Sequence, residues 1–224
     1  MKNNKLLIAL AIAACSTTAM ADEEVTYSFS VKNWNNKIKS TTSTGSTGTT
    51  TQAANSPVIG FTARKGDYFV SSSSLLDSSY RSGTVWLGRR DFDVSLGYRY
   101  NSNISFIGGY KSLAFRDGSW TNYEEYHKGI YLGVAGFHIL GDKTFLYGNY
   151  WNAPKMSSSG TSQVDTVNSF KLSNYELGTG YAISNSTQLT LGYRNQVAKD
   201  YNVTQSRSEK ISLSGIIFGV NLNF

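Results

Sequence analysis

Residues able to carry chemistry are few in this sequence. It has 2 histidines, 1 cysteine and 15 acidic residues among 224 positions. His127 follows Glu124 and Glu125, and a histidine beside a carboxylate can act as a general base. A surface or loop histidine is the alternative interpretation, and we favour it. The sequence therefore predicts no catalytic residues, no metal site and no cofactor.

Oppositely charged residues point to a different kind of site. Glu176 and Arg194 lie at equal distances from the turn residues Ser184-Asn185-Ser186, so a three-residue hairpin turn places them opposite each other on one face. Asp93 and Lys111 are related in the same way around a second three-residue turn. Directly opposed side chains lie about 5 Å apart at Cβ, which is close enough for ion pairs.

These pairs would point into the lumen if the strands form a barrel. The charged residues expected there are Lys32, Arg64, Asp93, Arg99, Lys111, Glu176 and Arg194. One interpretation is a polar plug whose charges satisfy each other and block flow. The other is a narrow, partly basic channel that favours small anions, since barrels of few strands are close to being filled by side chains.

The elements that position these residues are strands. Apolar residues recur at every second position, as in Ile216, Phe218 and Val220, and strand side chains alternate between two faces. Charged residues make up 16% of the chain, below the roughly 25% of soluble domains. A soluble sandwich would show the same alternation, so alternation alone does not identify a membrane barrel.

The connections between strands give a second signal. Tight turns are predicted at 65–67, 101–103, 141–143 and 184–186, and long loops at about 35–56, 76–83, 116–124, 153–169 and 196–208. Outer-membrane barrels have short periplasmic turns and longer external loops. The Ser/Thr/Gly-rich stretch at 40–56 suits a flexible external loop.

The predicted fold is all-β, a closed antiparallel transmembrane β-barrel of about ten strands, with eight or twelve as alternatives. The strands are expected at about 24–34, 57–64, 67–75, 84–100, 104–115, 125–140, 143–152, 170–183, 187–195 and 209–224. We assign 80–90 to the upper part of the fourth strand, with a separate short strand as the alternative. In the sixth strand either Ile130/Leu132/Val134 or Tyr131/Phe137/Ile139 could face lipid.

The first residues have the pattern of a secretory signal. A short basic segment precedes an apolar run at 6–14, and Ala19 and Ala21 provide the small residues at a cleavage site. The expected domains are a signal peptide at 1–21 and a barrel at 22–224, exported through the Sec pathway. The alternative is lipidation of Cys15, which follows a lipobox-like Ile-Ala-Ala.

The charge of the chain excludes one class of partner. The formal net charge is +6, and it falls to +4 once Lys2 and Lys5 leave with the signal peptide. These charges are scattered, with no long basic run, so the sequence predicts no binding of nucleic acid.

The last strand resembles the C-terminal insertion signal of Gram-negative outer-membrane proteins. The residues that carry this resemblance are Ile216, Phe218, Val220, Leu222 and Phe224. It implies recognition by the barrel-assembly machinery and a position in the outer membrane among lipid and lipopolysaccharide. Ten strands is also similar to omptin proteases and some adhesins, an analogy of fold alone. The paired acids and His–Asp pair of omptins are not found.

From these observations we expect a porin-like or structural envelope protein that passes small solutes at best. The first alternative is an adhesin-like or receptor-like barrel that binds partners through its external loops. An outer-membrane hydrolase acting through His127 is the second alternative.

Overall fold

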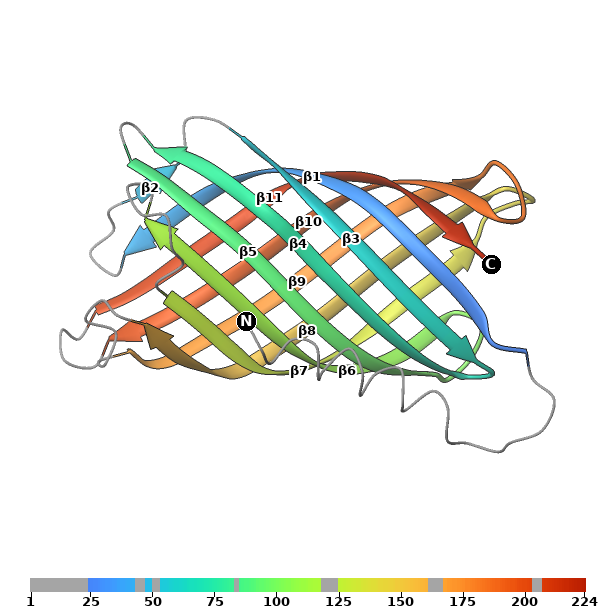
Figure 1. Cartoon of the computed structure of the whole chain (residues 1–224), viewed down its shortest axis with the longest axis horizontal. Helices are drawn as coiled ribbons and strands as arrows, with labels where there is room; N and C mark the ends of the chain where they lie inside the picture. The colour runs from blue at the N-terminus through green and yellow to red at the C-terminus, as the bar shows by residue number, and fades with distance from the viewer. Residues whose placement is uncertain are drawn as a thin grey trace.

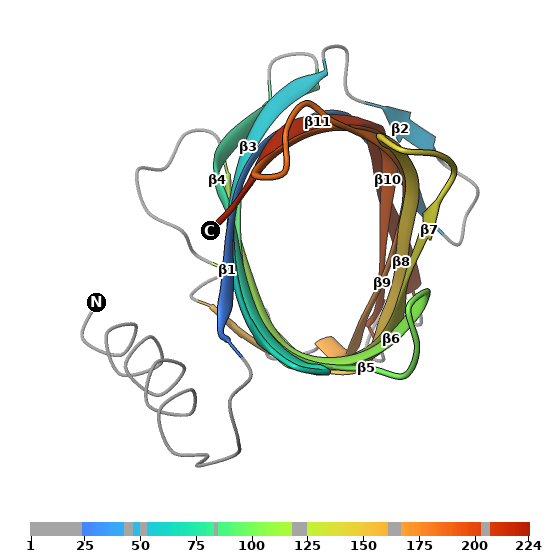
Figure 2. The same ribbon diagram turned by 90° about the vertical axis from the view of Figure 1, so that its right-hand side faces the viewer.

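The computed structural model describes residues 24–42, 47–49, 53–82, 85–117, 125–160, 167–202 and 207–224. They form one antiparallel sheet in which consecutive barrel strands pair, β1 with β3 and onward to β11, and β11 returns to pair with β1. Ten strands thus close a barrel, as the sequence predicts (Figure 1). Seen along its length, the barrel has an oval cross-section (Figure 2).

Most strands of the barrel are long. Their bounds are β1 Thr26–Thr42, β3 Ala54–Lys65, β4 Tyr68–Ser82, β5 Val85–Arg99, β6 Ile104–Asp117, β7 Glu125–Ile139, β8 Thr144–Gly160, β9 Val167–Ala182, β10 Thr187–Asn202 and β11 Arg207–Asn223. The short β2, Thr47–Thr49, pairs only with the upper part of β1. No helix in these parts of the chain is long and apolar enough to cross a membrane.

One end of the barrel carries the four tight turns, as expected, together with both ends of the described chain. The turn between β3 and β4 contains Gly66, whose φ of 58° lies in the left-handed region that glycine tolerates best. Backbone hydrogen bonds join Tyr27 to Phe224 at this end. We call this the short-turn end, and the opposite end the far end.

At the far end four of the five predicted loops are wrong over most of their length, and most of the fifth, at 116–124, lies outside the described residues. β1 continues eight residues past Trp34, β8 continues to Gly160, and β10 continues to Asn202. The predicted loop at 76–83 does not exist as a loop, because β4 runs through it to Ser82. Residues 80–82 therefore belong to the third barrel strand, which corrects that part of the assignment made for 80–90, whereas residues 85–90 lie in the fourth barrel strand as predicted.

These strands were predicted too short because the apolar residues change from one face of the strand to the other. On β1, the outward residues Tyr27, Phe29 and Val31 are exposed, whereas farther along the inward residues Trp34 and Ile38 are buried. The strand does not change its alternation; the apolar residues move from the outer face to the inner face. A search for one continuous period-two pattern ends at this point and assigns the remainder to a loop.

The short-turn half has an apolar exterior. Its exposed apolar side chains include Phe61, Leu96, Tyr98, Phe106, Ile130, Leu132, Val134, Leu146, Leu177, Tyr181, Leu189, Leu191, Phe218 and Val220. On β7 it is therefore Ile130, Leu132 and Val134 that face outward, since Tyr131 is buried inside. A continuous apolar band of this kind suits contact with lipid.

The interior of the short-turn half is built from glycine, serine and large rings. The ring of Phe69 lies over Gly97, that of Phe145 over Gly180, and a Cβ at either glycine would collide with it. These aromatic side chains thus lie flat against the neighbouring strand, on the lumen side of the wall. Rings placed over interior glycines stabilise such strands by covering otherwise bare backbone.

Register shifts occur near the far end, and two of them, on β4 and β8, change which residues face inward. On β4, Leu76 and Asp77 stand between the paired residues Leu75 and Ser78. On β8, Pro154 and Lys155 stand between Ala153 and Met156, at a kind of site where proline's missing N–H is tolerated. Each bulge transfers the inward face from odd to even residue numbers.

Several predictions lie outside the described residues. These are the signal peptide at 1–21 with Ala19 and Ala21, the lipobox at Cys15, Glu124, and residues 43–46 and 50–52 of the stretch at 40–56. They remain predictions.

Candidate functional site: the barrel interior

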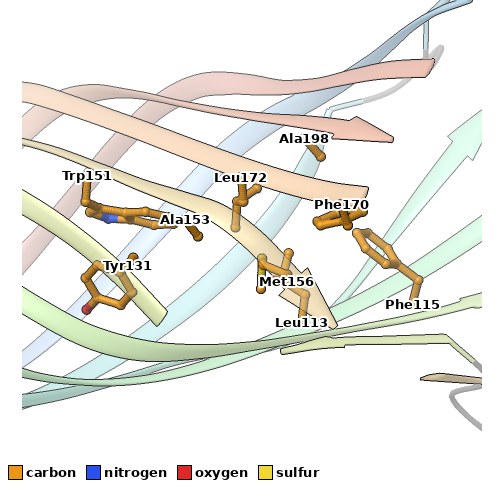
Figure 3. Close-up of a cluster of buried hydrophobic side chains, with 9 residues drawn as sticks. All are labelled: Leu113, Phe115, Tyr131, Trp151, Ala153, Met156, Phe170, Leu172 and Ala198. Carbon is orange, nitrogen blue, oxygen red and sulfur yellow. The ribbon is translucent and has the colours of Figure 1, made fainter. Parts of the chain in front are cut away.

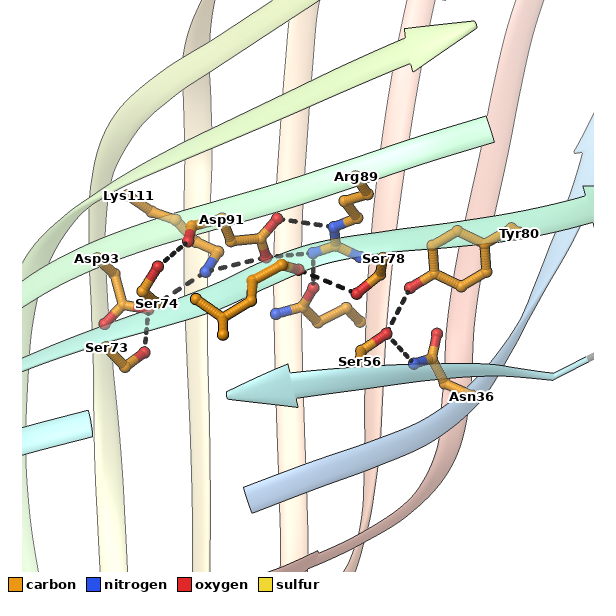
Figure 4. Close-up of polar contacts among 12 residues, drawn as sticks. Asn36, Ser56, Ser73, Ser74, Ser78, Tyr80, Arg89, Asp91, Asp93 and Lys111 are labelled. Atoms are coloured by element: carbon orange, nitrogen blue, oxygen red, sulfur yellow. Dashed lines mark hydrogen bonds and ion pairs between the residues drawn. The ribbon is translucent and has the colours of Figure 1, made fainter. Parts of the chain in front are cut away.

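A network of charged side chains lies inside the barrel, carried by β4, β5 and β6. Arg89 donates from Nε to Asp91 Oδ1 at 2.7 Å and also binds Gln196 of β10 across the lumen. Lys111 Nζ lies 3.3 Å from a carboxylate oxygen of Asp91 and 3.3 Å from one of Asp93. Ser73 donates to Asp93 at 2.8 Å (Figure 4).

A second network centres on Glu176 of β9. This carboxylate is 2% exposed and accepts from Arg194 Nε at 2.7 Å. Lys32 of β1 approaches its other oxygen at 3.5 Å. Glu176 therefore links three strands, and its charge is shared by two cations.

Aromatic rings complete the surroundings of these cations. Arg89 lies 5.9 Å from the ring centre of Trp34, and Arg194 lies 5.5 Å from the same ring. Lys111 lies 5.5 Å from the ring centre of Trp151. A cation over an aromatic face is attracted by the ring's quadrupole, more strongly where water is scarce.

The charged residues mark a change in the composition of the interior. On β6, Lys111 has Leu113 above it and Gly109 below it, taking the far end as the top. On β10, Arg194 has Thr190 and Gly192 below it, while buried Ala198 lies above. The charges therefore stand between an apolar region at the far end and a region of small residues at the short-turn end.

Two apolar clusters fill the interior of the far half. One comprises Leu113, Phe115, Tyr131, Trp151, Ala153, Met156, Phe170, Leu172 and Ala198 (Figure 3). The other comprises Trp34, Ile38, Ala54, Val58, Leu75, Tyr80, Leu213 and Ile217. Leu87 and Ile211 pack against both, so every barrel strand contributes to one apolar layer across the lumen.

Little space remains where the charges meet this layer. A cavity of about 30 Å³ is lined by Asp91, Asp93, Lys111, Arg194 and the apolar Trp151, among others. That volume is close to the space of a single water molecule in the liquid. A second, apolar hollow of about 660 Å³ involves the outward-facing Leu189, Leu191, Phe218 and Val220, and so lies on the outer wall.

A chain of polar side chains is also embedded in the apolar layer. Ser56 contacts the Tyr80 hydroxyl at 3.1 Å and accepts from the Asn36 amide at 3.0 Å (Figure 4). Each of the three residues comes from a different strand and is almost fully buried. Buried polar groups that pair in this way fix the strands relative to one another.

His127 is not the surface or loop histidine that we expected. It is 1% exposed, and its ring stacks on Phe170 at 3.7 Å while Phe115 meets it edge-on. Its Nδ1 forms a 2.8 Å hydrogen bond with Ser158 Oγ. The error arose because His127 was placed near a loop, whereas β8 extends far enough to cover it. Aromatic packing on the ring is typical of a structural histidine.

The structure pairs the residues that turn geometry predicted to pair. Glu176 lies opposite Arg194, and Asp93 lies opposite Lys111. Lys32 joins the first pair, which hairpin geometry could not foresee because β1 and β9 are far apart in sequence.

The remaining charged candidates lie near the short turns. Arg64 donates to the carbonyl of Gly66 at 2.9 Å, and Arg99 pairs with Asp67 at 3.1 Å in an exposed position. Neither reaches the central networks. His138 also lies at this end, where Nδ1 contacts the side-chain amide of Asn103 at 3.0 Å.

Sequence reasoning missed Arg89, Asp91 and Gln196. Arg89 and Asp91 share the odd parity of Asp93 in one strand, so the same alternation could have placed them inside. Gln196 was assigned to a loop that is in fact β10. Among the described residues no group of histidine, cysteine, aspartate and glutamate is arranged to hold a metal ion.

The residues of the last strand that resemble an insertion signal lie on one face. Ile216, Phe218, Val220 and Phe224 are exposed on the outer wall, and Leu222 shares their alternation. This placement is the one that a lipid-facing strand requires.

Comparison with known proteins adds the fold but no family. No protein-family model matches the sequence, and no curated protein matches it. The solved structures that resemble it are small β-barrels of Gram-negative outer membranes.

The outer-membrane protease OmpT of Escherichia coli is 11% identical, with a TM-score of 0.53 over 93% of this chain and 99% of that one. The translocator domain of the autotransporter NalP from Neisseria meningitidis is 8% identical, with a TM-score of 0.44 over 99% and 96%. Ail of Yersinia pestis is 11% identical, with a TM-score of 0.39 over 90% and 99%. Of these three, only OmpT has a TM-score above 0.5, and at 11% identity this similarity shows a shared fold.

Proposed function

We propose that this chain is an exported outer-membrane β-barrel with a sealed lumen. It acts as a structural envelope protein through its outer wall and far end, and it does not pass solutes. The observation that carries this proposal is the apolar layer to which all ten barrel strands contribute. Beneath it the charged side chains pair with one another, so few charges are left to attract a permeating ion.

The orientation follows from the asymmetry of the barrel. Short turns lie on the periplasmic side of bacterial barrels, so the far end faces outward from the cell. The exposed residues of β11 then meet lipid, in keeping with insertion by the barrel-assembly machinery and with lipopolysaccharide as the surrounding lipid. A role without catalysis agrees with the packing of aromatic rings on His127.

Single-channel recording in planar bilayers tests the sealed lumen. Folded protein, verified by faster gel migration when unboiled, should show no steady conductance in molar potassium chloride. Replacing Trp151 and Leu172 by alanine should introduce current fluctuations, because both side chains belong to the layer.

The matched control replaces Leu146 and Leu177, the outward-facing residues of the same two strands, by alanine. This double variant should remain silent. Steady conductance of the unaltered protein would contradict the proposal and restore the narrow channel favoured by small anions.

Surface binding through the far end is the alternative role. It predicts that a barrel with trimmed far-end connections keeps its gel mobility but loses attachment to a host cell or phage. Attachment that survives such trimming would exclude that role.

A further inference from the structure

A row of lysines crosses the outer wall near the far end. Lys171 of β9 lies directly opposite Lys199 of β10, which lies directly opposite Lys210 of β11. Lys155 of β8 lies in the bulge between Ala153 and Met156. Their partners on β9 are Leu172 and Phe170, so the bulge lies beside Lys171. All four are exposed. We call these four residues the lysine ladder.

The lysine ladder is unfavourable when left to itself. Like charges directly opposite on neighbouring strands repel each other and destabilise the sheet. Among the side chains that the structure describes, no carboxylate lies within ion-pair distance of these four lysines. An arrangement that repels itself over four consecutive strands becomes favourable when anions lie between the ammonium groups.

On the opposite wall of the barrel, basic residues lie near a carboxylate of the same protein. On β4 to β6, Arg116 pairs with Asp77 at 3.4 Å, and Arg90 lies across from the bulge that contains Asp77. A carboxylate therefore accompanies the arginines on that side. Basic residues near the far end can therefore have a carboxylate of the same protein beside them, and the four ladder lysines differ from these arginines in that respect.

The height of the lysine ladder relates it to the membrane surface. Tyr175 and Tyr193 are neighbours on the outer wall, with ring centres 6.4 Å apart, as in the aromatic belts of membrane proteins. Lys171 and Lys199 lie four and six residues farther along their strands. At about 3.3 Å per residue and a tilt of about 40°, they stand roughly 10–15 Å above the tyrosines.

The wall below the ladder is apolar and hollowed. The 660 Å³ hollow is lined by residues of β9, β10 and β11, the strands that carry three of the four lysines, together with residues of β1, β3 and β8. A molecule with both phosphate groups and acyl chains matches this combination. A free polyanion would match only the lysines.

We propose that the lysine ladder binds the phosphate groups of an anionic outer-leaflet lipid whose acyl chains lie against the hollow. This inference rests on the proposed place of the barrel in the outer membrane. According to this inference, the outer face of β8–β11 binds the anionic lipid more tightly than the outer face of β4–β6 on the opposite side of the barrel.

Titration of the folded full-length protein with diphosphoryl lipid A in zwitterionic micelles tests the site. Replacing Lys171, Lys199 and Lys210 by serine should weaken binding about tenfold or more. The matched control replaces Arg81, Arg90 and Arg116 by serine, which removes the same charge from the opposite wall. It should weaken binding less than about twofold.

The chemistry of the ligand is tested with two further probes. Lipid A without its phosphates should bind the unaltered protein weakly, and inorganic pyrophosphate, which lacks acyl chains, should also bind weakly. Equal losses in both triple variants, no loss in either, or tight binding of either probe would overturn the inference. If the protein fails to insert into phosphatidylcholine vesicles, the outer-membrane proposal fails as well; insertion without ladder-dependent binding defeats the inference alone.

Discussion

The two halves of the barrel are built in opposite ways. In the short-turn half the apolar side chains face outward and the interior holds glycine, serine and charged residues. In the far half the interior is apolar, and the outer wall carries residues such as Lys37, Lys171 and Lys199. One half is organised for lipid outside, and the other for water outside, as in a soluble protein. The level at which the faces exchange roles thus marks the edge of the lipid.

The largest effect is expected from a buried carboxylate in the interior. Glu176→Leu leaves Arg194 and Lys32 without their anion, and breaking a buried ion pair from one side costs about 3–5 kcal/mol. Asp67→Leu breaks the exposed pair with Arg99, which should cost less than about 1 kcal/mol. Urea unfolding in detergent or lipid vesicles measures both.

Similar losses for these two variants would show that water reaches the interior networks as freely as the rim. The difference between interior and rim would then disappear, and the case for a sealed lumen would weaken with it.

A pair of leucines on β9 compares the two halves directly. Leu172 is 1% exposed inside the far half, and Leu177 is 66% exposed on the outer wall. Leu172→Ala should cost about 2–5 kcal/mol of unfolding free energy because it leaves a cavity in packed surroundings. Leu177→Ala should cost less than about 1 kcal/mol, since lipid fills the space. Equal costs would contradict the inversion of faces.

Arginine substitutions on β10 locate the edge of the lipid. Leu191→Arg places a charge in the apolar band and should cost about 2–4 kcal/mol in a bilayer, whereas Val197→Arg, two outward positions beyond Tyr193, should cost about 0–1 kcal/mol. Both proteins can be compared by reversible unfolding in the same vesicles. A larger cost at Val197 would place the lipid edge higher than the exchange of faces indicates.

The sequence was sufficient for the short-turn half, whereas in the far half the predicted strands were too short on β1, β3, β4, β8 and β10, and the reason is physical. Near the tight turns one face of each strand is apolar throughout, so period-two alternation gives the strands, the turns and the pairing of Glu176 with Arg194. On β9 the apolar residues change from Tyr175 and Leu177 to Leu172 and Phe170, which have the opposite parity. A pattern that changes parity looks like a break, and on β1, where the same change occurs, the predicted strand ended at Trp34; on β9 the predicted strand at 170–183 included both sets of residues.

Contacts across the lumen were beyond the reach of local patterns. Lys32 meets Glu176, and Arg89 meets Gln196, only because the sheet closes on itself. Hairpin arithmetic pairs neighbours in sequence and cannot supply these partners. The bulge at Pro154 and Lys155 adds a further shift that brings Ser158 to His127.

The strands continue well beyond the level of Tyr175, and this determines how far the barrel extends above the lipid. β9 begins at Val167, eight residues farther along, which corresponds to a rise of about 20 Å. Because the interior of the far half is packed with apolar side chains, we expect this part of the barrel to be rigid. It holds the strand ends well clear of the lipid surface, so that another protein can approach them without first touching the membrane.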